Sequence, residues 1–177
     1  GLHRLQRDWE KRHTVTMHTF GGNVRWAHPN YHLGITAVHY TFGGKTMYPQ
    51  EQLYNRFAFR GEKNINMSVD YMWKNRWGKL YGETALSSNN AIATLNALQL
   101  TPASYFSLLV LHRYYDRRYQ AFFGNAFAQN STVQNEHGIY LGCQWTPFGH
   151  WKLSWYADFY RFPWLKYLID FPSTGKE

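Results

Sequence analysis

The chain lacks the features by which several protein classes are recognised. It has one cysteine, Cys143, so a disulfide within the chain is impossible and a cysteine-based metal site is not expected. No stretch reaches the roughly 18 apolar residues that a membrane-spanning helix needs. The longest apolar run centres on Leu108–Leu111 and ends at His112 and Arg113. These absences exclude a disulfide-stabilised scaffold and a helical membrane protein.

Acidic residues are also scarce. Lys and Arg total 19 against 11 Asp and Glu, which gives a net charge of +8, and nine His come in addition. A basic chain of this kind suits an anionic partner such as nucleic acid or acidic lipopolysaccharide. Basic residues that line a lumen or lie in solvated loops are the alternative interpretation.

Aromatic residues are abundant instead. Trp, Tyr and Phe make up 19% of the chain, although its mean hydropathy is negative. Transmembrane β-barrels combine these properties, because they carry aromatic girdles at both interfaces and polar residues in the lumen.

Period-two alternation predicts strands of membrane-crossing length. In Ile65–Trp73, apolar side chains alternate with Asn66, Ser68 and Asp70, over a length that crosses a bilayer when tilted. A bend or bulge is expected at Gly21-Gly22. The pattern predicts about eight strands, over Thr14–Ala27, Tyr31–Phe42, Ile65–Trp73, Lys79–Leu86, Ala91–Leu100, Ser104–Tyr115, Gly138–Thr146 and Lys152–Phe162.

The connections between these strands alternate in length. The even-numbered connections along the chain include the long segments from Gly43 to about Lys63, from Asp116 to His137 and after Phe162. Ser87–Asn90 is a short connection in the same set. Bacterial barrels have short periplasmic turns and longer extracellular loops in this alternation. We therefore predict an all-β, antiparallel up-and-down transmembrane β-barrel.

Residues 1–177 are expected to form one barrel domain or a fragment of a larger barrel. The chain starts at Gly1 without an apolar stretch of the signal-peptide type, and Pro172–Glu177 is typical of a loop or turn rather than a closing strand. A barrel in lipid tolerates no free edge. A piece of a larger barrel is therefore the favoured interpretation.

Charged residues within the predicted strands are the first candidates for function. Asp70, Glu83, Arg113 and Asp158 are expected to face the lumen, where they either pair and fix its shape or select a solute.

A second set of candidates lies around the loop that begins at Asp116. Arg117, Arg118 and Tyr119, with Asn135 and Glu136 at the far end of the loop, could bind phosphate and stack bases or sugars. An interfacial belt that meets lipid phosphates is the alternative.

Catalysis and metal binding are not expected. Glu136 and His137 are adjacent, but neighbouring strand residues point to opposite faces. Ser131 has no elbow motif around it, and the His spacings fit no metal site. The chain is therefore predicted not to be an enzyme and to need no cofactor.

The tryptophans at predicted strand ends or turn flanks form a third set. A membrane girdle is the first interpretation, and a glycan-stacking platform is the second. The set comprises Trp73, Trp77, Trp145, Trp151, Trp155 and Trp164.

Several segments, in order, also resemble a known family. They are Gly82–Ala85, Arg113–Tyr115, Tyr119–Phe122, Asn125–Phe127, Asn135–Gly142 and Tyr156–Tyr167. They look like the C-terminal barrel region of large Bacteroidota envelope proteins labelled ComEA-related or helix-hairpin-helix domain proteins, and the resemblance is strongest from about Phe57 onward. It implies an outer-membrane barrel. The DNA-binding helix-hairpin-helix modules of that family are not recognisable here.

Two functions follow as hypotheses. The first is an outer-membrane barrel segment that forms or scaffolds a passage for DNA or another polymer, in contact with outer-membrane lipid and lipopolysaccharide and, through a longer parent protein, with nucleic acid. The second is a β-rich surface module that binds glycans on aromatic platforms. The outward face of Met67, Val69, Tyr71 and Trp73 distinguishes them, because a sandwich would cover it with a second sheet.

Overall fold

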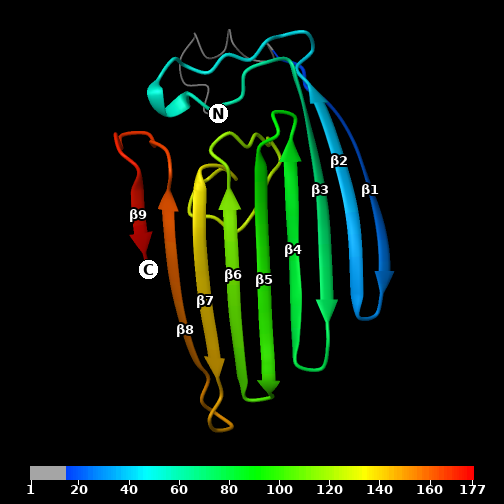
Figure 1. Cartoon of the computed structure of the whole chain (residues 1–177), viewed down its shortest axis with the longest axis vertical. Coiled ribbons are helices and arrows are strands. Elements are labelled where there is room, and N and C mark those ends of the chain that lie inside the picture. The colour runs from blue at the N-terminus through cyan, green and yellow to red at the C-terminus, as the bar shows by residue number, and fades with distance from the viewer. Residues whose placement is uncertain (1–14) are drawn as a thin grey trace.

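Residues 15–177 form a single antiparallel sheet in the computed structural model (Figure 1). The sheet has nine strands in the order of the sequence, β1 to β9, so every neighbouring pair is an up-and-down connection. No α-helix occurs in this part of the chain; Leu53–Asn55 forms one 3-10 turn, η1. The strands are β1 His18–His28, β2 Tyr31–Thr41, β3 Lys63–Lys74, β4 Gly78–Ser87, β5 Ile92–Ala103, β6 Phe106–Tyr115, β7 Glu136–Trp145, β8 Leu153–Phe162 and β9 Ser173–Lys176.

The all-β, up-and-down prediction is confirmed at this level. Each of the expected strands is present within a few residues of its predicted ends, although Thr14, the first residue of the first one, lies outside the described residues. The end of the chain was predicted wrongly as a loop or turn, because Ser173–Lys176 pairs with β8. A run as short as Ser-Thr-Gly-Lys is too brief to show alternation.

Of the bend or bulge predicted at Gly21-Gly22, the bulge is not present. Gly21 pairs with Val38 and Gly22 with Ala37 in an unbroken β1–β2 register. The irregularity lies instead between Leu100 and Ala103. Pro102 falls within it, and proline has no backbone N–H to give to a strand ladder.

The sheet is open among the described residues. β1 pairs only with β2, and β9 pairs only with β8. The nine strands therefore form a sheet with two edges rather than a closed barrel.

One face of the sheet, here called the covered face, carries the buried residues. Cross-strand partners point to the same side, and the register places Tyr40, Ala93, Arg113, Glu136 and Asp158 on this side. All of them are buried. The long β6–β7 loop, residues 116–135, folds against this face and supplies the contacts that bury them.

The opposite side, here called the open face, is largely apolar and uncovered. Met67, Val69 and Trp73 are 55%, 43% and 52% exposed, and no second sheet lies over them in residues 15–177. The same face carries further exposed side chains, namely Phe20, Val24, Trp26, Leu33, Ile35, Ile65, Leu80, Leu86, Ile92, Leu98, Leu100, Ile139, Leu141, Trp145, Trp155 and Phe159.

Charge divides sharply between the two faces. The strand carboxylates of β3, β4, β7 and β8 all lie on the covered face. On the open face, the only strand Lys and Arg residues in the described part of the chain are Lys63, Arg161 and Lys176. All three lie towards the end of the sheet that carries the long loops (Figure 1). The middle of the open face is therefore free of Lys, Arg, Asp and Glu side chains.

Candidate functional site

The β6–β7 loop is the feature that organises the covered face. Its backbone is held at separate points by strand side chains: the Tyr115 hydroxyl donates to the Phe127 carbonyl (2.8 Å), and the amides of Asn64 and Asn66 donate to the Gln120 carbonyl (2.9 and 2.8 Å). Since these donors belong to β3 and β6, the loop crosses the face of the sheet instead of extending into solvent.

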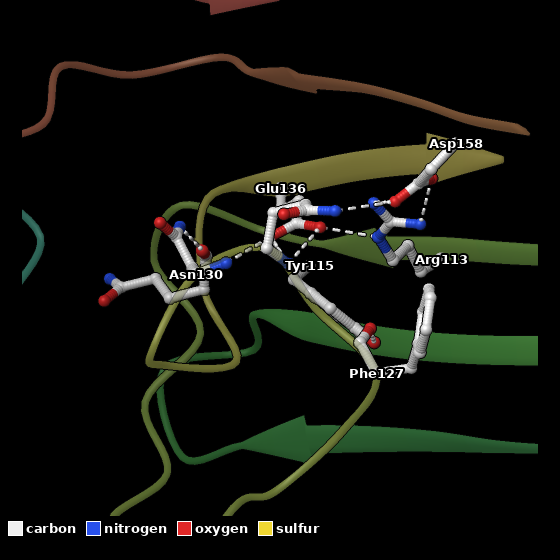
Figure 2. Close-up of polar contacts among 8 residues, drawn as sticks. Arg113, Tyr115, Phe127, Asn130, Glu136 and Asp158 are labelled. Atoms are coloured by element: carbon white, nitrogen blue, oxygen red, sulfur yellow. Dashed lines mark hydrogen bonds and ion pairs between the residues drawn. The ribbon is translucent and has the colours of Figure 1, made fainter. Parts of the chain in front are cut away.

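A buried ion triad lies at the base of this loop (Figure 2). Arg113 donates from both terminal nitrogens to the Asp158 carboxylate, at 2.8 and 2.9 Å, and from Nε to Glu136 at 2.5 Å. The side chains of Arg113 and Glu136 are 0% exposed, and that of Asp158 is 2% exposed. The bidentate geometry is the strong form of an arginine–carboxylate contact.

Both carboxylates also accept hydrogen bonds from the loop. Glu136 accepts from the backbone N–H groups of Gln129 (3.0 Å to each oxygen) and Asn130 (2.9 Å), and the Gln129 side chain donates to Asp158 at 2.9 Å. Removing charges from water costs several kcal/mol for each ion, and only a fully hydrogen-bonded arrangement offsets that cost. The triad therefore fastens the returning end of the loop to β6, β7 and β8.

The guanidinium of Arg113 lies between two aromatic rings. Its carbon is 5.2 Å from the centre of the Phe127 ring and 6.0 Å from that of Tyr160. Gly138 provides the space on β7, because a Cβ atom there would lie 2.6 Å from the guanidinium carbon. Any larger residue at this position would displace the arginine from its carboxylates.

The long loops meet one another at the same end of the sheet. The Phe57 ring packs against Trp164 (centroids 4.9 Å apart), and the Arg117 guanidinium lies 4.8 Å from Phe57 and 5.3 Å from Trp164. Asn135 pairs with the backbone of Trp164 through its side-chain oxygen and nitrogen, at 2.7 and 3.0 Å. The loops after β2, β6 and β8 therefore form a connected cap.

The structure places the four strand charges predicted to face a lumen on the covered face. Arg113 and Asp158 belong to the triad. Asp70 on β3 contacts His32 on β2 (3.0 Å) and Arg25 on β1 (3.5 Å). Glu83 is exposed on β4 and lines a hollow beneath the loop. Two of the four residues are thus brought together, and Glu136, predicted as a loop residue, completes their cluster.

The five predicted loop-binding residues differ in accessibility. Tyr119, Asn135 and Glu136 are buried and contact the protein itself, and burial raises the pKa of Tyr119 to about 12. Arg117 and Arg118 are exposed. These two arginines are therefore the members of the set that remain available to an external ligand.

Arg118 has an acidic partner of its own within the loop. It contacts Asp116 at 3.1 Å. Burial disfavours the charged form of Asp116, but hydrogen bonds from Arg118 outweigh this effect and lower the pKa of that carboxyl below its ordinary value.

The tryptophans separate into two groups. Trp73, Trp77, Trp145, Trp151 and Trp155 lie at the end of the sheet where the short turns are, and Trp26, which the sequence analysis did not select, joins them on β1 (Figure 1). Trp164 lies at the opposite end, where its indole N–H donates to the Leu53 carbonyl at 3.2 Å. Trp164 follows the end of β8 by two residues and belongs to the loop cap.

Several residues of this site carried no sequence signal. Gln120, Phe127, Gln129 and Asn130 act largely through main-chain groups or from an irregular loop, and neither leaves a periodic pattern. Asn64 and Asn66 were visible only as polar members of an alternating strand. In residues 15–177, no group of His, Cys, Asp and Glu side chains could hold a metal ion, and no helix is long and apolar enough to cross a membrane.

Comparison with known proteins gives no match. No protein-family model fits the chain, and neither a curated protein nor a solved structure is similar to it. The class that the fold itself defines is a nine-stranded antiparallel meander with a loop packed on one face. The resemblance to helix-hairpin-helix envelope proteins stays a prediction.

Proposed function

We propose that this chain is wall of a transmembrane β-barrel in a bacterial outer membrane, where it forms or scaffolds a passage. The open face carries the proposal: it is largely apolar over eight adjacent strands and has no Lys, Arg, Asp or Glu in its middle. The polar side chains that lie there, Thr84, Thr94, Asn96 and His112, form hydrogen bonds with one another or with Tyr71 and His137. A soluble protein rarely leaves so large an apolar surface uncovered. Lipid is the environment in which such a face is stable.

The lengths and ends of the strands support the same proposal. β1 to β8 are 10 to 12 residues long, and transmembrane strands of about 9–11 residues cross the hydrocarbon when tilted. Trp26, Trp73, Trp145 and Trp155 lie on the open face at the short-turn end, the position of an interfacial girdle. The long loops would then lie outside the cell.

The two open edges of the sheet, at β1 and β9, call for further strands if the sheet lies in a membrane. Unpaired backbone groups of an edge strand cost several kcal/mol each in hydrocarbon. We therefore propose that further strands pair with β1 and β9 to complete a larger barrel. Kinship with the C-terminal barrel region of the helix-hairpin-helix envelope proteins belongs to the same proposal and is supported by the segments named above.

The covered face would line the passage. Its exposed part carries the polar side chains of Gln99, Gln144 and Ser154, with Lys79 opposite Gln99 on β4, and the β6–β7 loop occupies the half nearer the long loops. We propose that this loop narrows the passage. DNA or another polymer is the proposed cargo, supported by the net charge of +8 and by the family resemblance.

One observation favours the alternative of glycan binding. Tyr140 and Tyr156 are stacked on the covered face, with centroids 6.1 Å apart and planes at 15°. Parallel rings beside amide and hydroxyl groups can stack on a sugar and hydrogen-bond to it. In this second candidate function, the same face binds glycans without any passage through a membrane.

Membrane extraction of the full-length protein that carries this chain tests the barrel proposal. We expect it to remain in the outer-membrane fraction until detergent is added, and to migrate differently on a gel before and after heating, because a closed barrel resists unfolding in cold detergent. Release into buffer without detergent, with a single mobility, would contradict the proposal and favour the soluble glycan-binding module.

A single charge on the open face separates the two functions further. We expect Val69→Arg to destabilise the membrane-inserted protein by about 2–4 kcal/mol, since arginine at the midplane of the lipid-facing side is costly. Ser68→Arg is the matched control, because Ser68 is the adjacent β3 residue on the covered face. Urea unfolding in lipid vesicles measures both, and equal stabilities would rule out a lipid-facing Val69.

A further inference from the structure

The open face has a groove at its β7–β9 side. Its volume is about 920 Å³, and its lining includes His137, Ile139, Leu141, Phe159, Arg161 and Lys176. The groove thus lies on the face that the barrel proposal turns towards lipid, and the inference drawn from it rests on that proposal.

Basic groups gather at one end of the groove. Arg161 on β8 lies opposite His137 on β7, and Lys176 on β9 lies opposite Phe159 on β8. Phe159 is the next β8 residue that points to the same face as Arg161, so Lys176 is a diagonal neighbour of Arg161. Directly opposed side chains start about 5 Å apart and diagonal ones about 7–8 Å apart, so Arg161 can share one ligand with either neighbour. Arg161 and Lys176 are exposed, and within residues 15–177 neither forms an ion pair.

The rest of the groove is apolar and extends away from these cations. Ile139, Leu141 and Phe159 are 44%, 40% and 51% exposed. Ala157, the partner of Leu141 on β8, is small, so no large side chain on β8 covers Leu141. No carboxylate lines the groove. The site therefore presents positive charge at the long-loop end and hydrocarbon below it.

This polarity matches an amphiphile in one orientation. We propose that the groove binds a phosphorylated acyl lipid of the outer leaflet, with its phosphate on Arg161 and Lys176 and its acyl chains along Ile139, Leu141 and Phe159. The cations lie at the membrane level where lipid phosphates lie if the long loops face outward. A free phosphate would leave the apolar floor exposed, and a neutral lipid would leave the two cations without a counter-charge.

The His112–His137 pair adds a further donor beside the phosphate position. The two Nε2 atoms are 3.1 Å apart on the open face, so one ring donates to the other. When His112 is the donor, the neutral His137 ring carries its proton on Nδ1, which can be donated to a ligand. His137 itself lines the groove. The hydrogen bond with His112 can therefore hold the His137 ring in an orientation that faces the bound headgroup.

Native mass spectrometry of the detergent-purified full-length protein tests this site. The probes are bis-phosphorylated lipid A and phosphatidylcholine, each titrated into the wild type and into the variant R161Q/K176Q. Charge-assisted hydrogen bonds are the strong contacts in such a site, so we expect the double variant to bind lipid A about tenfold or more weakly and phosphatidylcholine unchanged. The variant R76Q/K79Q, which removes the same charge at the opposite end of the sheet, should bind lipid A like the wild type.

Three outcomes would overturn the inference. They are equal lipid A binding by R161Q/K176Q and the wild type, equal binding of phosphatidylcholine and lipid A by the wild type, and full competition by inorganic phosphate, which would indicate a headgroup-only site. Heat-modifiable mobility of each variant is measured in parallel. If the wild type shows heat-modifiable mobility but one of these three outcomes occurs, only the proposed lipid site is rejected. If the wild type shows no heat-modifiable mobility, the barrel proposal itself is contradicted.

Discussion

Replacing Arg113 with methionine is expected to lower the free energy of unfolding by about 3–5 kcal/mol, because it leaves buried carboxylates without their cation. Glu136 and Asp158 are 0% and 2% exposed, and the remaining donors to them are amide groups of the β6–β7 loop. Methionine retains much of the volume between the Phe127 and Tyr160 rings, so the expected loss is electrostatic rather than a cavity effect. Urea unfolding in lipid vesicles, followed by tryptophan fluorescence, measures the change.

Two further variants identify the cause of that loss. The triple variant R113M/E136Q/D158N removes all three charges together, and we expect it to recover a large part of the stability, because amides keep hydrogen-bonding capacity without the cost of a buried charge. Arg118→Met is the control, since Arg118 forms an exposed contact with Asp116 and exposed pairs contribute about 0–1 kcal/mol. If R113M and R118M were equally stable, the triad would not hold the loop.

The strands were predictable because their environment is two-sided. From Ile65 to Trp73, β3 is apolar on the open face and, except for Met72, polar on the covered face, and a boundary between two different surroundings imposes period two. β6 shows the limit of this rule. Leu108 and Leu111 lie on opposite faces, so a run that is apolar on both sides gives no register until its partners are known.

Sheet edges and bulges were not predictable from the same pattern. Gly21 and Gly22 are compatible with a bulge, but β2 offers a continuous partner and their ladder is regular. β9 consists of the four residues Ser173–Lys176 and exists through its pairing with β8. Both features depend on what the neighbouring strand provides, and that information lies far away in the sequence.

The triad shows how a site can be half visible in a sequence. Arg113 and Asp158 were recognisable as charges in polar-facing strand positions, and Glu136 as a polar residue at a loop end. Their pairing was not, because β6, β7 and β8 must first align in register to bring together residues 23 and 45 positions apart. The loop direction was equally hidden, since a loop that folds onto the sheet and one that extends into solvent can have the same composition.

The second large effect is expected from shortening the loop that crosses the covered face. Replacing Ala121–Ala128 with a Gly-Ser pair removes Phe122 and Phe127, which pack on Tyr40 and on Arg113. If the covered face lines a water-filled passage, we expect a several-fold larger single-channel conductance, because a pore narrowed by a folded loop widens when that loop is removed. Planar-bilayer recordings of the full-length protein measure this change.

The control for that experiment is a loop that lies outside the proposed passage. Tyr48 is 78% exposed, Gln50 and Glu51 are also exposed, and Pro49 is half-buried. Replacing this stretch with the same Gly-Ser pair should leave conductance unchanged. A shortened β6–β7 loop that keeps heat-modifiable mobility and wild-type conductance would mean that the loop supports the wall without narrowing a passage. An increase confined to the β6–β7 variant would make Arg113, Glu136 and Asp158 the anchor of a constriction, since they fix the point where the loop returns to the sheet.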